Sequence, residues 1–190
     1  FAGPALTPKP ADPEALAWLF YTSGTTGRSK GAMLSQRNLM ALTLSHLADV
    51  ESLDEHCSQI HAAPMSHGSG MYIPAYVACG ARQIVPASGG FEPDEFLSLC
   101  CEHTGVGAFL APTMVQRLRH SLPHLGAAPA GLRSIIYGGG PMYVQELKQS
   151  LAAFGQVFVQ IYGQGESPMT ITWLRREDHT STDDAILGSV

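Results

Sequence analysis

Short apolar runs alternate with stretches of helical periodicity along most of this chain. We expect a buried strand at residues 16–20 and further strands at residues 58–63, 82–85, 106–110, 134–137 and 157–161. We expect a helix that Ser35 caps, and helices at residues 71–78, 94–103, 112–119 and 144–154, with loop from His120 to Gly131. Strands that alternate with helices form a largely parallel sheet covered by helices. The sequence therefore predicts an α/β fold.

Three unusual stretches each follow a predicted strand. They are Pro64-Met65-Ser66-His67-Gly68, Gly138-Gly139-Gly140-Pro141-Met142 and Tyr162-Gly163-Gln164-Gly165-Glu166. Ligands of open α/β sheets bind at the carboxyl ends of the strands. We therefore expect all three stretches at one edge of the sheet, together with the loop that follows residues 16–20.

That loop, residues 21–31, has the composition of a polyphosphate-binding loop. It combines glycines, the hydroxyl side chains of Thr22, Ser23, Thr25 and Thr26, and two cations; the glycines are Gly24, Gly27 and Gly31, and the cations are Arg28 and Lys30. Glycines let backbone N–H groups converge on anionic oxygens, and a lysine adds a point charge for phosphate. The spacing does not fit the common G-x-x-x-x-G-K-[ST] P-loop. A solvated surface loop is the alternative interpretation of this composition.

Residues 21–31 resemble the phosphate-loop signature of the adenylate-forming (AMP-binding) superfamily. That family includes acyl-CoA synthetases, luciferases and the adenylation domains of peptide synthetases. Ser29 stands where the family usually has proline. The three strand-exit stretches also match family motifs, in the same order. The resemblance, closest to fatty-acid–CoA ligases, implies a subdomain of the N-terminal domain of such an enzyme.

The resemblance also implies roles for individual residues. ATP would be contacted by Thr22, Ser23, Gly24, Thr25, Thr26, Gly27, Lys30, Gly138, Gly139, Gly140, Pro141, Tyr162, Gly163, Gln164 and Gly165. Lys30 and Glu166 would be catalytic, Thr25 and Glu166 would hold Mg²⁺, and His67 and Gly138 would border the acid substrate. Gly140 replaces the family's usual alanine, and Gly165 replaces a threonine that reaches the α-phosphate.

The reaction implied by the resemblance has two steps. A carboxylic acid and ATP give an acyl-adenylate and pyrophosphate, and a thiol such as coenzyme A then displaces AMP. Three alternatives remain open: the adenylation domain of a peptide synthetase, a P-loop kinase or ATPase, and a non-catalytic nucleotide-binding module. The P-loop alternative is opposed by the spacing of the loop.

Composition narrows the classes of function. The net charge is −5, from 11 basic and 16 acidic residues, without the basic stripe that nucleic-acid binding requires. The longest apolar stretches are too short to span a membrane, and the N-terminus has no signal-peptide pattern. The four cysteines form no C-x-x-C pair. Reduced thiols in a cytoplasmic protein are expected.

The two ends of the sequence suggest part of a larger protein. Residues 1–13 contain four prolines and no periodicity, and we expect them to be a linker or a severed end. Residues 14–190 are expected to form the AMP-binding subdomain. By the resemblance, flanking parts would be needed for activity, so this chain alone is expected to be inactive. Apolar surface exposed on the severed side would favour self-association, for example as a homodimer.

Overall fold

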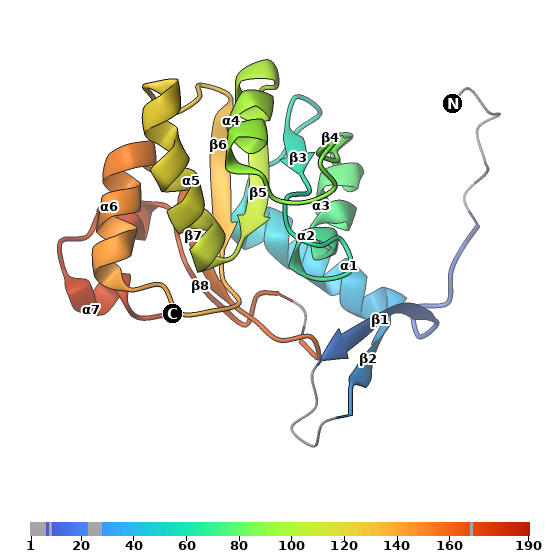
Figure 1. Ribbon diagram of the computed structural model, residues 1–190. Helices are drawn as coiled ribbons and strands as arrows, with labels where there is room; N and C mark the ends of the chain where they lie inside the picture. The colour runs from blue at the N-terminus through green and yellow to red at the C-terminus, as the bar shows by residue number, and fades with distance from the viewer. Residues whose placement is uncertain (1–6, 8, 23–27, 168) are drawn as a thin grey trace.

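The computed structural model describes residues 7, 9–22, 28–167 and 169–190. Its centre is a six-stranded sheet in the order β4-β3-β5-β6-β7-β8 (Figure 1). The strands are β3 (Ser58–Ile60), β4 (Arg82–Ile84), β5 (Val106–Leu110), β6 (Leu132–Tyr137), β7 (Phe158–Tyr162) and β8 (Thr172–Leu174). All neighbouring strands are parallel except β7 and β8. The predicted α/β class with a largely parallel sheet is confirmed.

Helices cover both faces of this sheet (Figure 1). The helices are α1 (Gln36–Ser45), continued by a π-helical turn (His46–Val50), α2 (Gly68–Met71), α3 (Ile73–Ala78), α4 (Pro93–Glu102), α5 (Pro112–Leu125), α6 (Val144–Phe154) and α7 (Asp184–Leu187), with a 3-10 turn at Glu177–Thr180. Within the described residues, none of these helices has the length and apolar character needed to cross a bilayer.

Strand β5 shows how the sheet divides the interior into two cores. Val106, Ala108 and Leu110 pack with residues of α4, α5 and α6, whereas Phe109 packs with α2, α3 and β1. Successive side chains of a strand point to opposite faces, so a strand buried on both faces reads as one apolar run. This is why residues 106–110 could be recognised as a strand although they show no alternation.

A separate antiparallel hairpin lies beside the sheet and corrects one prediction. Its strands are β1 (Leu16–Thr22) and β2 (Lys30–Ser35). We predicted a buried strand at residues 16–20, but within the described chain Leu16 and Leu19 are 48% and 46% exposed, and Phe20 is the buried residue of β1. The hairpin contributes Phe20 of β1 and Leu34 of β2 to the core, whereas Leu16, Leu19 and Met33 stay exposed. Strand β2 was not predicted.

The other differences concern helix ends. Helix α5 continues to Leu125, although we predicted loop from His120 because of Pro123. Proline in the last turn removes one backbone hydrogen bond, which is less damaging than a proline in mid-helix. His120 and His124 are therefore helical, yet no group of three or more metal-ligating side chains occurs among the described residues. The predicted cap of α1 by Ser35 is confirmed as a capping box with Asn38.

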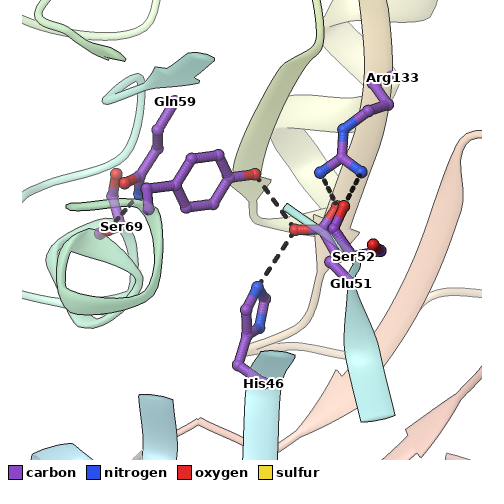
Figure 2. Close-up of polar contacts among 7 residues, drawn as sticks. His46, Glu51, Ser52, Gln59, Ser69 and Arg133 are labelled. Atoms are coloured by element: carbon purple, nitrogen blue, oxygen red, sulfur yellow. Dashed lines mark hydrogen bonds and ion pairs between the residues drawn. The ribbon is translucent and has the colours of Figure 1, made fainter. Parts of the chain in front are cut away.

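A buried ionic cluster lies between the π-helical turn and β6, and Figure 2 shows Glu51 at its centre. Glu51 Oε1 accepts a hydrogen bond from Arg133 Nη2 at 3.0 Å, and Glu51 Oε2 accepts one from the Tyr76 hydroxyl at 3.1 Å. His46 Nε2 lies 3.3 Å from Glu51 Oε2, and Arg133 Nη1 donates to the Ser52 carbonyl. Burial alone would raise the pKa of Glu51, but His46 and Arg133 together hold it below its ordinary value of 4.5.

We predict that Glu51→Gln destabilises the fold, since the change leaves the Arg133 guanidinium without its buried counter-charge. Breaking a buried ion pair from one side costs about 3–5 kcal/mol. The measurement is denaturant unfolding at neutral pH, with Glu55→Gln as the matched control because the Glu55 side chain is 71% exposed. Equal free energies of unfolding for the two variants would contradict the prediction.

The lowered pKa of Glu51 also makes the free energy of unfolding depend on pH, in a direction that can be stated. A lowered pKa means that the folded state takes up a proton less readily than the unfolded chain. The stabilisation by Glu51 is therefore present above the unfolded pKa and is lost as the pH falls through the lower, folded pKa. In acid the stability gap between the wild type and Glu51→Gln should narrow.

Candidate active site

A hollow of about 350 Å³ lies at the carboxyl edge of the sheet. It is lined by residues from all three strand-exit stretches: Pro64, His67 and Gly68 after β3, Gly138 and Gly139 after β6, and Gly163, Gln164 and Gly165 after β7. Phe20 of β1 closes another side. The expectation that these stretches meet at one edge is therefore confirmed. Their chemical roles stay predictions.

Two glycines allow the strand exits to approach one another closely. A Cβ atom at Gly138 would lie 2.5 Å from the carbonyl oxygen of Ile161, on the neighbouring strand β7. A Cβ atom at Gly163 would lie 1.8 Å from the carbonyl oxygen of Met169. Both distances are below any real contact, so a side chain at either position would push two backbone segments apart. The hollow keeps its shape because neither position carries a side chain.

His67 lies at the mouth of the hollow, immediately before α2. Its ring centroid is 5.1 Å from that of Phe20, and its Nδ1 atom is 3.3 Å from the Ser66 hydroxyl. The side chain is exposed, so it can meet a ligand without first losing a buried partner. This placement agrees with a role in positioning substrate, which stays a prediction.

Behind His67, a buried polar network fixes helix α2. The Ser69 hydroxyl lies 2.8 Å from His61 Nδ1, and His61 Nε2 lies 2.8 Å from Gln83 Oε1. Gln59 Nε2 donates to the Ser69 carbonyl at 2.9 Å (Figure 2). Burial lowers the pKa of His61, which favours a neutral ring that accepts one hydrogen bond and donates another. Sequence reasoning missed this network because a buried His or Ser carries no local signature.

Five of the predicted nucleotide-binding residues at the other strand exits are exposed: Gly139, Gly140, Pro141, Tyr162 and Gln164. Tyr162 is the last residue of β7 rather than a loop residue, and its side chain is 47% exposed. Gln164 Nε2 donates to the Tyr162 hydroxyl at 2.9 Å, which restrains both side chains. Gly140 and Pro141 are also exposed but do not line the hollow. An open ring face on Tyr162 could stack on a flat base.

Lys30 and Glu166 lie outside the hollow. Lys30 is the first residue of β2, paired with Thr22 of β1, and not a loop residue as we predicted; its side chain is nonetheless exposed. Glu166 borders a different depression of about 230 Å³, beside Asn38 and Ser45 of α1. The predicted residues Ser23, Gly24, Thr25, Thr26 and Gly27 lie outside the described residues. The structure therefore does not test the phosphate loop.

Gly165 is buried and has no room for the threonine that the family resemblance leads one to expect. A Cβ atom there would lie 2.5 Å from Phe20 Cδ1 and 2.8 Å from Thr22 Cγ2. Phe20 is itself buried, so the ring cannot simply swing into solvent. In this chain the hairpin packs against the position where the extra hydroxyl would stand. A threonine and this position of the hairpin exclude each other.

We predict that Gly165→Ala destabilises the chain by overpacking, at a cost of about 1–3 kcal/mol. Gly90→Ala is the matched control, because a Cβ atom at Gly90 would meet nothing within 4 Å. Thermal unfolding of both variants checks this: Gly165→Ala should lower the melting temperature, and Gly90→Ala should leave it close to that of the wild type. Equal melting temperatures would show that the hairpin yields without cost.

A parallel α/β sheet whose glycine-rich strand exits surround one hollow is the arrangement of nucleotide- and small-ligand-binding α/β proteins. The chain belongs to the AMP-binding enzyme family, whose profile matches residues 2–190. The predicted family is confirmed.

Several relatives are CoA ligases. A medium/long-chain-fatty-acid–CoA ligase of Mycobacterium tuberculosis is 30% identical over 167 residues, which cover 88% of this chain and 29% of that protein. A 2-succinylbenzoate–CoA ligase of Enterococcus faecalis is 28% identical, covering 90% of this chain and 34% of that protein. Among solved structures, ATP-bound MatB from Rhodopseudomonas palustris is 32% identical with a TM-score of 0.72, covering 87% of this chain and 32% of that one. The chain thus spans about a third of the length of these relatives.

Proposed function

We propose that the protein containing this chain activates a carboxylic acid with ATP and transfers the acyl group to the thiol of coenzyme A. The observation that carries the proposal is the hollow at the carboxyl edge, where the three strand-exit motifs converge in a member of the AMP-binding enzyme family. CoA ligases among the relatives support coenzyme A as the acceptor. Transfer to a carrier-protein thiol, as in peptide synthetases, is the alternative.

In the proposed first step, a carboxylate oxygen attacks the α-phosphorus of ATP. A new bond forms between that oxygen and phosphorus, the bond to the bridging oxygen breaks, and pyrophosphate leaves with the electron pair. Catalysis of this type depends on alignment and charge stabilisation rather than on a general base. His67 and the Gly138–Gly139 backbone would hold the acid, and Tyr162 would stack on adenine beside the exposed turn of Gly140 and Pro141.

The charge of the departing pyrophosphate would be balanced by Lys30, the backbone of the phosphate loop and Mg²⁺. Mg²⁺ is usually held by one or two carboxylates together with substrate phosphates. Glu166 is an exposed carboxylate that suits this mode, and Thr25 would add a hydroxyl oxygen. The ion would neutralise negative charge on the phosphate oxygens when bound.

The proposal is tested by acid-dependent exchange of labelled pyrophosphate into ATP, measured on the complete natural protein with a panel of carboxylic acids. Exchange that requires both an acid and the protein supports adenylation. Addition of coenzyme A should then release AMP and a thioester. If no acid supports exchange while ATP still binds, the chain would be a nucleotide-binding module without this activity.

We predict that Lys30→Ala slows adenylation while the fold is retained, because the side chain is exposed at the start of β2. Loss of one charge-assisted hydrogen bond costs about 1.5–3 kcal/mol, a slowing of roughly 10- to 150-fold. Arg37→Ala is the control for removing an exposed cation, since Arg37 pairs with Glu14 and not with the hollow. Unchanged exchange kinetics in Lys30→Ala would show that this lysine does not take part in adenylation.

We predict that Glu166→Gln weakens metal binding, since the amide keeps the size of the side chain and loses its charge. The apparent Mg²⁺ requirement of exchange should rise, and a higher Mg²⁺ concentration should restore part of the rate. The measurement is exchange rate against Mg²⁺ at fixed ATP, with Glu177→Gln as an exposed carboxylate control. A low rate that no Mg²⁺ concentration improves would assign Glu166 another role.

A further inference from the structure

The hollow at the carboxyl edge is mostly apolar, and its described lining residues include no Asp, Glu, Lys or Arg. Its walls are Phe20, Phe109, Met114, Ile161 and Met169, together with small residues and the polar His67 and Gln164. A second charged group on a ligand would therefore enter this hollow without a counter-charge.

Phe109 forms the floor of the hollow. A Cβ atom at Gly68 would lie 2.3 Å from Phe109 Cε1, and one at Gly139 would lie 3.9 Å from Phe109 Cζ. The ring therefore reaches from the exit of β3 to the exit of β6. Behind it, the ring of Tyr72 stacks at a centroid distance of 5.9 Å, and Tyr72 is only 2% exposed. The floor is thus two aromatic layers thick and cannot recede without repacking the core.

The size of the hollow limits what it can hold. Its 350 Å³ correspond to about a dozen water-sized groups, at about 30 Å³ each. A carboxylic acid with a short alkyl chain or a single ring fits this space. An alkyl chain that extends toward the interior of the protein meets the Phe109 ring, whose own exposure is 9%.

We propose that this hollow accepts the acyl group of a compact monocarboxylic acid with an uncharged, apolar body, and that Phe109 limits the length of that group. The proposal rests on the proposed function, since it names the acid for that reaction. Apolar walls select against a second carboxylate by desolvation, and the aromatic floor selects against long chains by sterics. Phe109 acts on specificity and makes no bond to the reacting atoms.

The first test compares hexanoate, adipate and hexadecanoate in pyrophosphate exchange by the complete natural protein. Hexanoate and adipate have the same chain length and differ by one terminal carboxylate. We expect kcat/KM for hexanoate to exceed that for adipate by about 100-fold and that for hexadecanoate by about 10-fold. Adipate or hexadecanoate as the better substrate would overturn this inference and leave the proposed function standing. Absence of exchange with every acid would overturn the proposed function itself.

The second test replaces Phe109, the residue that forms the floor of the hollow. Phe109→Ala should raise the ratio of kcat/KM for hexadecanoate to that for hexanoate by about 10-fold, because the chain gains depth. Phe96→Ala is the matched control: Phe96 is equally aromatic and buried, but it lies in α4 and packs in the core on the opposite face of the sheet. This variant should lose stability without changing the ratio. If Phe109→Ala does not fold, Phe109→Leu gives a smaller enlargement, and an unchanged ratio in a folded variant would overturn the proposal.

Discussion

Burial of the sheet on both faces is the constraint on which the rest of this structure depends. Helices cover both faces, so the interior strands β5, β6 and β7 are buried along nearly their whole length. Backbone groups and side chains that must reach a ligand are therefore accessible where the strands end. The glycines after β3, β6 and β7 gather at one edge for this reason, and the hollow forms between backbones that approach one another closely.

The sequence was informative wherever a local pattern determines the structure. Continuous apolar runs predicted the strands β5 and β7. A hydrophobic period of 3.6 residues predicted α6 with the bounds that the structure has. The rule that ligands bind where parallel strands end correctly predicted that His67, Gly138 and Gly163 lie together. The family resemblance was carried by motifs at those same edges, and the family was confirmed.

The failures have a common physical origin in contacts between residues far apart in the sequence. Whether β1 is buried depends on what packs against it, and its apolar run reads the same in either case. Phe109 and Met169 look like ordinary core residues in sequence, and only the fold shows that they face a hollow. The same holds for the Glu51 cluster, where Arg133 lies 82 residues further along the chain. The predicted end of helix α5 was wrong for a different reason. Pro123 lies in the last turn of the helix and does not end it.

The buried ion pair that stabilises the fold and the hollow lie at different ends of the sheet. The Glu51–Arg133 ion pair lies near the start of β6, whereas the hollow opens at its end. The buried Glu51–Arg133 pair can therefore stabilise the fold without placing charge near the apolar hollow. At the functional edge, Phe20 is the one buried residue of β1, and it contacts both the His67 ring and the space beside Gly165. Phe20 is the described hairpin residue that lines the hollow, so a displacement of β1 at this ring would change the shape of the hollow.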